Sequence, residues 1–562
     1  MVLPQKWYLI KTDKIRVEKI KKEFNFSTTF SKVLIERGIK TEKEIEKFLA
    51  PSIESLHSPS LLPDIEVAFE RTDKAIRNGE KILIWGDEDT DGITATVFTY
   101  ELLKNLNANV IYHIPNRKDE GIGLNIPGII KAAEMGVKLI ITVDCASSDG
   151  EEIEEAKKMG IDVIVTDHHE LTTDEKKNFP LVNPKRKDSV YPFPEISGVT
   201  VAFKFGWYIA TNLLALKNNE WESIIDTWYP LILLGTYADR VPLRDENLSL
   251  ARLGLQSLQK TERSGIKILR EMLCKKKFCD EIMLQKTISV LSNAKTKGWG
   301  ENIGFRILTE TNSDYLYTTI AQLLLESEKW HSLANKNFRK IVSFFKQKEE
   351  KEVIFHYVPE IPYDFLGFCT SRLKEMLSRP VVLMTDKDNI IIGEARAPQE
   401  FNIHEILSKQ ENLFLSFGGH KPACGFKMEK KNIEKLKRFF TENYSEITGS
   451  DTIRKEMRII DILPLEKITM RLKDEIMLLL PFGTTNPPPL FLARNLSFAN
   501  GAYSYVTSET GKTEKIEMKN DNHAWVGIGG KPVTLDIVYY INSFGFPSIA
   551  DARPSIFNES VE

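Results

Sequence analysis

Acidic and imidazole side chains follow four apolar runs of this chain, each at the point where the run ends. The runs and their polar ends are Ile82–Trp85 before Gly86-Asp87-Glu88-Asp89-Thr90-Asp91-Gly92, Leu139–Val143 before Asp144-Cys145, Asp162–Thr166 before Asp167-His168-His169, and Leu231–Tyr237 before Ala238-Asp239. Parallel strands gather ligands at their carboxyl ends, so adjacent runs of this kind would bring several hard ligands to one edge of a sheet. Such a set predicts a two-metal hydrolytic site.

The chain must turn after the first apolar run if both of the aspartates there are to bind one cation. Asp87 and Asp89 are two residues apart, and Gly92 permits the chain to turn into a following helix. Glu88, between the two, is expected to point elsewhere. Asp91 is interpreted as a helix N-cap in preference to a ligand.

The second and third polar ends carry the sharper local signals. A carboxylate such as Asp144, at the end of an almost wholly apolar strand, is costly to bury unless it is metal-bound or paired. A mixed set of carboxylates and imidazoles favours manganese, with magnesium as a substitute. The alternative for Asp167-His168-His169 is a polar loop with fortuitous histidines, which the presence of four such ends in one chain disfavours.

Strands and helices alternate over the region that must position these residues. Strands are predicted at 82–86, 109–114, 138–143 and 162–166, with helices between them near 93–105, 126–135 and 149–159. This alternation predicts an α/β fold with a parallel sheet covered on both faces.

The length of 562 residues is enough for three or four domains. We expect a helical lead segment over 1–60, the parallel-sheet domain over 61–312, a helix over 313–350, a smaller α/β domain over 351–447 and a C-terminal β-barrel over 448–562. The smaller domain is predicted to contain strands at 353–357, 380–384 and 389–394 and a helix near 366–378. The segment 313–350 has no proline or glycine, which favours one long connecting helix over an ordinary surface helix.

Composition sets broad limits on the protein. There are 76 basic and 79 acidic residues, for a net charge of −3, so binding to a nucleic acid would need a local basic surface. No run of about 20 apolar residues predicts a membrane span, and the first residues lack the apolar core of a signal peptide. The five scattered cysteines fit reduced thiols. We therefore expect a cytoplasmic protein without a membrane partner.

Taken in order, the polar ends resemble the motifs of the DHH phosphoesterase superfamily. Further segments resemble its RecJ branch, the associated DHHA1 domain and an oligonucleotide-binding (OB) barrel. These segments are Ile114-Pro115-Asn116-Arg117 with Glu120-Gly121-Ile122-Gly123-Leu124, Val182-Asn183-Pro184-Lys185, Gly367 with Ser371-Arg372-Leu373, Gly393-Glu394-Ala395-Arg396, Gly418-Gly419-His420, and Leu480-Pro481-Phe482-Gly483. The resemblance extends over essentially the whole chain.

This resemblance implies a hydrolase that digests single-stranded DNA from its 5′ end to mononucleotides, in recombination and repair. Carried over by motif position, the implied ligands of two divalent cations are Asp87, Asp89, Asp144, His168, His169 and Asp239. Asp144 would bridge the two ions, and Asp167 would support the histidines or join the site directly. The place of Asp239 depends on the resemblance alone, because the run before it could be a helix as easily as a strand.

Several positions depart from the family pattern without removing an implied ligand. Ala146 stands where glycine is usual, Ile122 where tyrosine is usual, and Thr200 where glycine is usual. The sequence Asn293-Ala294-Lys295-Thr296 lacks the usual Gly-Arg. These departures indicate a divergent member whose substrate handling differs.

A strand-degrading enzyme must also hold a phosphate backbone, which arginine, lysine and backbone amides usually contact. The candidates for phosphate binding are Arg117, Ser371, Arg372, Arg396, Gly418, Gly419 and His420. The alternative for Arg117 is an ion pair with Glu120. In the predicted barrel, Phe498, Tyr503, Tyr505 and Trp525 are candidate stacking platforms, although an aromatic residue taken alone more often belongs to a core.

Two other functions remain open on this sequence. One is a phosphodiesterase of short oligoribonucleotides or cyclic dinucleotides, which the expected barrel disfavours because short substrates need no extra strand-binding platform. The other is a catalytically silent scaffold in a replication complex, which the retained ligands disfavour. A monomer that meets single-stranded DNA, and with it a single-strand-binding protein or a helicase, is the expected arrangement.

Overall fold

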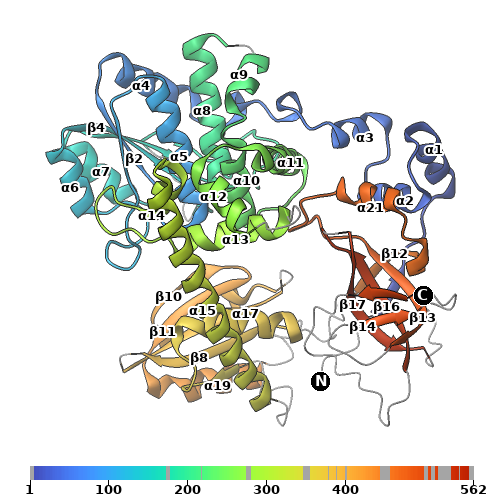
Figure 1. Ribbon diagram of the computed structural model, residues 1–562. Helices are drawn as coiled ribbons and strands as arrows, with labels where there is room; N and C mark the ends of the chain where they lie inside the picture. The colour runs from blue at the N-terminus through green and yellow to red at the C-terminus, as the bar shows by residue number, and fades with distance from the viewer. Residues whose placement is uncertain are drawn as a thin grey trace. The chain divides into compact units, whose positions relative to one another are not determined.

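The structure is a computed structural model of the chain. It describes residues 6–171, 178–216, 218–273, 280–345, 355–377, 379–387, 389–398, 401–443, 456–498, 504–507, 513–516, 533–543 and 545–555. The chain forms two compact units (Figure 1), one made of 11–325 and 460–558 and the other of 1–10 and 326–459.

The first unit is built on a five-stranded, wholly parallel sheet. Its order is β3-β2-β4-β5-β6, with β2 at Lys81–Trp85, β3 at Val110–His113, β4 at Val137–Val143, β5 at Asp162–Thr166 and β6 at Leu181–Val182. Successive residues of β2 face two different cores, with Ile82 and Ile84 in one and Leu83 and Trp85 in the other. The predicted parallel sheet covered on both faces is therefore confirmed.

Helices cover the two faces of this sheet (Figure 1). The helices that contribute to the larger core include α4 (Ile65–Arg77), α5 (Thr90–Asn105), α8 (Gly198–Leu214), α10 (Tyr229–Ala238), α11 (Asp245–Lys260), α12 (Ser264–Leu273), α13 (Asp280–Asn293) and α14 (Ile303–Thr309). The other face is covered by α6 (Ile126–Glu134) and α7 (Gly150–Lys158). A short helix, α9 (Asn218–Ile225), follows α8.

The fourth apolar run, Leu231–Tyr237, forms part of the helix α10 and does not belong to the sheet. It packs against α5, α8 and α11. A helix surrounded by other helices is apolar on every side, so its sequence lacks the polar stripe that would distinguish it from a buried strand. Its carboxyl end nevertheless carries Asp239 to the same edge as the strand ends.

The second unit contains a five-stranded mixed sheet in the order β10-β11-β9-β8-β7. The strands are β7 (Phe355–Tyr357), β8 (Val381–Lys387), β9 (Ile390–Arg396), β10 (Phe414–His420) and β11 (Ala423–Met428). Helix α17 (Leu366–Leu377) covers one face, and α18 (Ile403–Ser408) and α19 (Ile433–Glu442) cover the other. The first three strands and α17 match the predicted elements, whereas β10 and β11 were not predicted.

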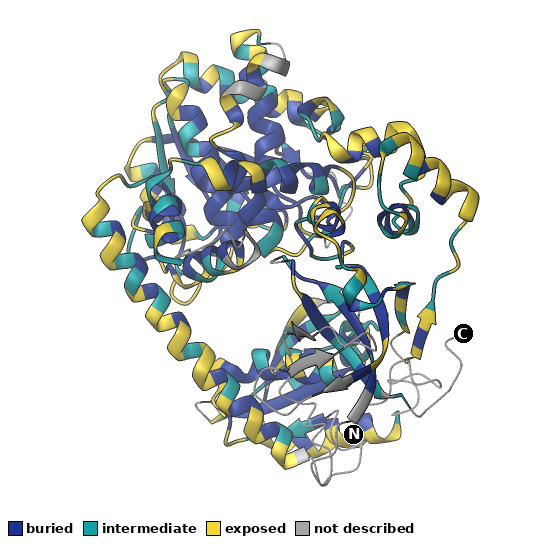
Figure 2. Ribbon diagram, turned by 45° about the vertical axis from the view of Figure 1, so that its right-hand side comes forward, coloured by how far each residue is buried: buried dark blue, intermediate teal, exposed yellow. Residues whose placement is uncertain are grey.

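The segment expected to be one long helix forms α15 over Ser313–Phe345. Leu316 and Ile320 near its start belong to the core of the first unit, and Phe338 and Ile341 near its end belong to a core of the second. Buried and exposed residues alternate along it (Figure 2), as on an amphipathic helix. None of the described helices has both the length and the apolar character that a bilayer span requires.

The C-terminal strands form an extended sheet, without a closed barrel in the described part of the chain. They are β12 (Glu456–Ile462), β13 (Leu490–Phe498), β14 (Ser504–Thr507), β15 (Thr513–Ile516), β16 (Val533–Ile541) and β17 (Pro547–Pro554), with α21 (Met470–Met477) after β12 and β1 (Lys6–Leu9) parallel to β12. Among the described pairs, β17 is bonded only to β16 and β15 only to β14. The predicted β-rich region is therefore present, but the pairing that would close a barrel is not.

The lead segment and the C-terminal segment are fastened to the first unit by buried polar groups. The lead segment contains α1 (Lys14–Phe24), α2 (Thr28–Glu36) and α3 (Glu42–Leu49). The buried guanidinium of Arg252, on α11, lies 3.6 Å from the ring centroid of Phe48 and donates to the carbonyl oxygens of Phe48, Leu478 and Leu480. Burial and the nearby Arg37 lower the pKa of Arg252 to about 9.

A second buried cation joins α8 to α11. The Nζ atom of Lys204, whose side chain is fully buried, lies 2.7 Å from Oε2 of Glu246 and donates to the carbonyl oxygen of His57 at 2.5 Å. Glu246 also accepts from the hydroxyl of Tyr191 and from the backbone N–H of His57. Burial lowers the pKa of Lys204, and its contact with Glu246 opposes that change.

Lys204→Met should lower the free energy of unfolding by about 3–5 kcal/mol, because Glu246 would stay buried without its cation. Urea unfolding followed by circular dichroism measures the change. The matched control is Lys267→Met, whose exposed ammonium pairs with Glu262, and it should change stability by less than about 1 kcal/mol. Equal stability of the two variants would show that the buried pair does not stabilise the fold.

Candidate metal centre

The strand ends and the end of α10 bring all seven predicted catalytic residues to one place. Asp87 and Asp89 follow β2, Asp144 follows β4, the Asp167-His168-His169 triplet follows β5, and Asp239 follows α10. Their ligand atoms fall into three overlapping groups, each with all atoms within 4.8 Å of one another. The groups are Asp87 with Asp89 and Asp144, Asp144 with Asp167, His168 and His169, and Asp91 with His168 and Asp239.

Asp144 and His168 lie at the centre of this cluster, and both are buried. Nε2 of His168 is 3.1 Å from Oδ1 of Asp144, 3.7 Å from Oδ2 of Asp239 and 3.9 Å from Oδ2 of Asp91. Oδ1 of Asp144 accepts no hydrogen bond from any described residue. A buried carboxylate oxygen without a donor is costly, so the donor set fits a cation bound at this point.

The electrostatics of the cluster favour the same conclusion. Burial, followed by repulsion from neighbouring carboxylates, raises the pKa of both Asp144 and Asp91 well above the usual aspartate range. Burial and then Asp89 raise the pKa of Asp239 to about 6. Burial and the adjacent His169 lower the pKa of His168 to about 4, which leaves a neutral imidazole that can act as a ligand.

Asp167 holds the histidines in place. Its carboxylate accepts from the backbone N–H groups of Ser147, His168 and His169 at 3.1, 2.7 and 3.2 Å, and lies 2.7 Å from Nδ1 of His169. Burial alone would raise the pKa of Asp167, but these hydrogen bonds and the histidines lower it below its usual value. The contact at Nδ1 raises the pKa of His169 to about 9, so Nε2 would have to lose its proton before it could bind a metal ion.

Asp91 has a different role from the one expected. The N-cap of α5 is Asp89, whose Oδ1 accepts from the backbone N–H of Gly92 at 3.0 Å. Asp91 lies inside the first turn, and its carboxylate accepts from the first backbone N–H groups of α8, at Gly198 (2.7 Å) and Val199 (3.0 Å). Sequence reasoning missed it as a member of the cluster, although three aspartates at alternate positions were the available signal.

Close backbone approach completes this corner of the site. A Cβ atom on Gly198 would lie 2.3 Å from Oδ1 of Asp144, so only glycine lets α8 begin this close to the carboxylate. The loop after β4 has left-handed backbone at Asp144 (φ 63°) and at Ala146 (φ 79°). Ala146 adopts this conformation although it carries a side chain, at a cost of about 1–2 kcal/mol.

Arg117 joins the cluster directly. Its Nε is 3.0 Å from Oδ1 of Asp87, and its Nη2 contacts Oδ2 of Asp87 and lies 3.0 Å from Oδ2 of Asp89. The alternative pairing with Glu120 is wrong, because Glu120 lies 2.9 Å from Nε2 of His113 and accepts from the backbone N–H of Asn116. Burial would lower the pKa of Arg117, but the contacts with Asp87 and Asp89 raise it overall.

Glu88 is a further residue whose role the sequence did not reveal. Its side chain is buried and joins two loops. Oε2 accepts from the backbone N–H of Arg117 at 3.2 Å, and Oε1 accepts from the backbone N–H of Thr296 at 3.0 Å. The two loops also meet where the side-chain amide of Asn116 donates to the Thr296 carbonyl oxygen at 3.0 Å.

Some of the predicted phosphate-binding residues of the second unit lie on neighbouring strands of its sheet. The strand register places Gly418, Gly425 and Glu394 side by side, and likewise the backbones of His420, Ala423 and Arg396. Arg396 lies 2.7 Å from Glu394, and both side chains lie against Gly367 of α17. Gly419 has positive φ (142°), and a Cβ there would lie 2.4 Å from the Ala423 carbonyl oxygen.

Arg372 contacts residues of α15 and α17, and no contact with Arg396 is described. It follows Ser371 on α17, but its guanidinium donates to Asn335 of α15 and lies over the rings of Phe338 and Phe368. These contacts give Arg372 a packing role within the second unit.

The remaining predicted contacts are only partly covered by the structure. Tyr503 and Trp525 lie outside the described residues, and Tyr505 lies on β14 opposite Lys515. In the short basic run 185–187, Arg186 pairs with Asp64 and Asp188, and Lys185 lies 3.2 Å from Glu170. Lys185 and Arg186 are therefore engaged in ion pairs.

Comparison with known proteins agrees with this arrangement. The model of the DHH family, N-terminal domain, matches residues 81–236, and the model of the DHHA1 domain matches residues 350–446. The single-stranded-DNA-specific exonuclease RecJ of Bacillus subtilis is 29% identical over 498 residues, which are 87% of this chain and 62% of that protein. RecJ of Escherichia coli is 27% identical over 497 residues, 81% of each protein. The chain thus spans less than two thirds of the Bacillus relative.

Solved structures show the same fold. The crystal structure of RecJ from Thermus thermophilus in complex with Mn²⁺ matches with a TM-score of 0.78 at 21% identity and covers 99% of this chain and 80% of that chain. A crystal structure of exonuclease RecJ bound to manganese matches with a TM-score of 0.56 at 26% identity, over 68% of this chain and 95% of that chain. The chain therefore carries a DHH-family N-terminal domain over residues 81–236 followed by a DHHA1 domain over residues 350–446, and it is similar to RecJ over most of its length.

Proposed function

We propose that this protein is a metal-dependent exonuclease that degrades single-stranded DNA from the 5′ end to mononucleotides, in DNA recombination and repair. The observation that carries the proposal is the buried Asp144 carboxylate, which lies among other carboxylates and the neutral His168 without a hydrogen-bond donor. The relatives named above are single-stranded-DNA-specific exonucleases, which supports the choice of substrate.

Two divalent cations would complete the site, with manganese as the first candidate and magnesium as a substitute. The Thermus RecJ has been solved with each of these ions, which supports both. The residues that would hold them are Asp87, Asp89, Asp91, Asp144, His168, His169 and Asp239, with Asp144 shared between the two ions. When bound, the cations would activate a water molecule and stabilise the charge on the leaving oxygen of a phosphodiester.

The protein's own residues would orient these ligands and the substrate. Asp167 fixes the ring of His169 through Nδ1, which leaves Nε2 as the nitrogen that could bind a cation once it has lost its proton. Arg117 is held at Asp87 and Asp89 by two of its nitrogens, and a phosphate at that edge would meet its planar guanidinium. We propose that Arg117 binds the terminal 5′-phosphate.

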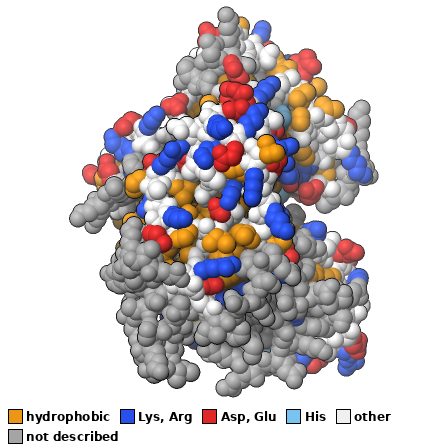
Figure 3. Space-filling model, turned by 90° about the vertical axis from the view of Figure 1, so that its right-hand side faces the viewer, with side chains coloured by type: hydrophobic (Ala, Val, Ile, Leu, Met, Phe, Trp, Pro, Cys, Tyr) orange, Lys and Arg blue, Asp and Glu red, His pale blue; other side chains and the backbone are white. Residues whose placement is uncertain are grey.

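The second unit and the C-terminal segment would bind the rest of the strand. Arg396 with the Gly418-Gly419-His420 strand end is the proposed phosphate-binding corner of the DHHA1 domain. Ser371 on α17 is a further candidate, and Arg372 would have to leave Asn335 to join this corner. The C-terminal sheet is proposed to be OB-like, with Tyr503, Tyr505 and Trp525 as stacking platforms. On the face in Figure 3, basic and acidic side chains are interspersed, so strand binding would depend on local sites of this kind.

The proposed division of the chain keeps the boundaries at 61–312 for the DHH domain, 313–350 for the connecting helix, 351–447 for the DHHA1 domain and 448–562 for the C-terminal domain, after a lead segment over 1–60. A cytoplasmic monomer is the proposed form. It would meet a single-strand-binding protein or a helicase on its substrate.

Asp144→Asn should reduce the release of mononucleotides from a 5′-labelled 30-mer, in the presence of manganese, by at least about 10²–10³-fold. The variant should remain folded, because it removes a repelled buried charge. Asp73→Asn, on the surface of α4, is the matched control and should retain full activity. Full activity of Asp144→Asn would contradict the metal site, and faster cleavage of a 3-mer than of the 30-mer would favour a short-oligonucleotide phosphodiesterase.

Manganese binding should release protons, and more of them at pH 6 than at pH 8. The pKa values of Asp144 and Asp91 are raised, that of Asp239 is about 6 and that of His169 is about 9, so these ligands bind protons in the metal-free protein. Because a ligand must lose its proton to bind the ion, the apparent affinity should fall as the pH falls. Calorimetry in two buffers of different ionisation enthalpy measures the released protons, and a pH-independent affinity would exclude these groups as ligands.

Glu88→Ala should raise the KM for a 5′-phosphorylated strand about 10-fold, because the backbone of Arg117 would lose its anchor. The manganese affinity should not change, since Glu88 belongs to none of the ligand groups. The KM of Glu88→Gln, which retains one acceptor oxygen, should lie between those of Glu88→Ala and the wild type. The control is Glu151→Ala, because Glu151 is an exposed residue of α7. A weakened manganese affinity in Glu88→Ala would show instead that Glu88 is a ligand.

A further inference from the structure

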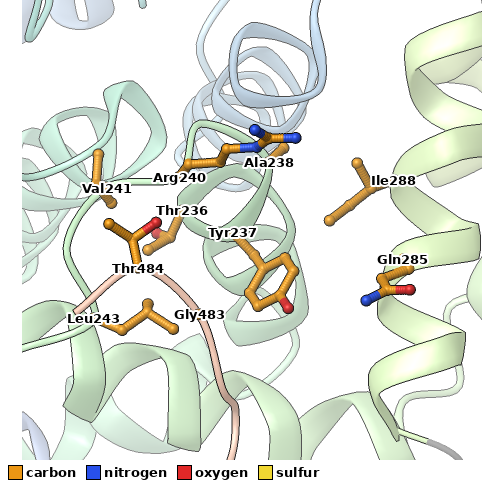
Figure 4. Close-up of a pocket in the computed structure, with 10 residues that line it drawn as sticks. All are labelled: Thr236, Tyr237, Ala238, Arg240, Val241, Leu243, Gln285, Ile288, Gly483 and Thr484. Carbon is orange, nitrogen blue, oxygen red and sulfur yellow. The ribbon is translucent and has the colours of Figure 1, made fainter. Parts of the chain in front are cut away.

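A pocket of about 390 Å³ opens beside Asp239 in the first unit (Figure 4). It is lined by the end of α10, by α13 and by the C-terminal loop at Gly483 and Thr484. Ala238 and Arg240, which flank Asp239 in the chain, both line it. The pocket therefore adjoins the metal centre at Asp239, whereas Arg117 meets the centre at Asp87 and Asp89.

Local backbone features build this pocket. Arg240 takes the left-handed conformation (φ 58°) directly after α10, which turns the chain toward Leu243. The backbone N–H of Leu243 then donates to the carbonyl oxygen of Thr484 at 2.8 Å. A Cβ on Gly483 would lie 2.7 Å from Cδ1 of Leu243, so a glycine is needed where the C-terminal loop approaches this wall.

The chemistry of the lining differs from that of the adjacent cluster. No carboxylate lines the pocket, and its one charged lining residue is Arg240, which makes no side-chain hydrogen bond or ion pair with the described residues. In Figure 4 the ring of Tyr237 lies between the C-terminal loop and the side chains of Gln285 and Ile288 on α13. The pocket thus combines an aromatic ring, an aliphatic wall, a side-chain amide and a cation.

We infer that this pocket binds the second nucleotide of the strand, on the 3′ side of the phosphodiester that is cleaved. The inference rests on the proposed function. The ring of Tyr237 stacks with the base, Gln285 contacts the base edge, and Arg240 contacts the phosphate that follows. A volume of about 390 Å³ is within the range of small-ligand pockets, which begin at roughly 300 Å³.

The position of the pocket determines which nucleotide it receives. With the terminal phosphate at Arg117 and the first phosphodiester at the metal centre, the next nucleoside lies beyond Asp239. Because base stacking is indifferent to base identity, the pocket would hold any sequence, as complete degradation of a strand requires. It would also retain the shortened strand after each cleavage.

The test uses 5′-phosphorylated 30-mers with a single abasic site at the first, second or fifth position and manganese as the cation. For the wild type, an abasic second position should raise KM about 5- to 100-fold, the range expected from the loss of one stacked base. An abasic fifth position should have no comparable effect.

Variants then assign the effect to the pocket. Tyr237→Leu should raise KM on the intact strand and lose the discrimination against the abasic second position, whereas Tyr237→Phe should retain it. Arg240→Gln should raise KM on every strand. The matched control is Arg244→Gln, because Arg244 follows on the same loop but pairs with Glu195 and lies over Phe193.

Two outcomes separate this inference from the proposed function. Cleavage of the intact strand by the wild type, with equal KM values for abasic sites at the second and fifth positions, would overturn the pocket assignment and leave the nuclease intact. Absence of cleavage by the wild type would overturn the function. Independently of activity, binding of thymidine 5′-monophosphate, followed by ligand-observed NMR, should weaken in Tyr237→Leu and Arg240→Gln but not in Arg244→Gln, and equal binding by all three would overturn the assignment.

Discussion

The arrangement of the first unit depends on the repulsion among carboxylates that are buried together at one edge of the parallel sheet. Asp87, Asp91 and Asp144 are each at most 3% exposed, and burial followed by repulsion from neighbouring carboxylates raises the pKa values of Asp91 and Asp144. A fold gains nothing from such a cluster unless a cation is bound there. The burial of several carboxylates together therefore affects both the stability of the first unit and the ability of the site to bind a cation.

Neighbouring elements are arranged to reduce this repulsion without removing it. The first N–H groups of α8 donate to Asp91, where the positive end of a helix dipole favours negative charge. Arg117 neutralises part of the charge on Asp87 and Asp89, and Glu88 holds the Arg117 backbone. Nε2 of His168 and Oδ1 of Asp144 remain 3.1 Å apart, and Oδ1 accepts no hydrogen bond from a described residue. A cation would bind to these two atoms.

The sequence predicted those parts of the site that depend on local patterns. The strands before Asp87, Asp144 and Asp167 are continuous apolar runs, and strand ends in a parallel sheet meet at one edge. The sequence left open whether the run before Asp239 is a helix or a strand, since a helix that is buried on every side has no polar stripe. Sequence reasoning also missed the roles of Asp91 and Glu88, because their partners are backbone N–H groups in distant parts of the chain, which leave no trace in residue type. The unpredicted strands β10 and β11 contain three glycines, at 418, 419 and 425, and strand propensities disfavour glycine.

The three carbonyl oxygens that Arg252 binds belong to segments more than 400 residues apart in the chain, at Phe48 and at Leu478 and Leu480. One side chain thus joins both ends of the sequence to the catalytic unit. The C-terminal segment consequently cannot be regarded as a detachable module. A shortened chain that ends before residue 478 would leave a buried guanidinium without two of its acceptors, so modular recombination with other DHH proteins would have to exchange α11 together with both terminal segments.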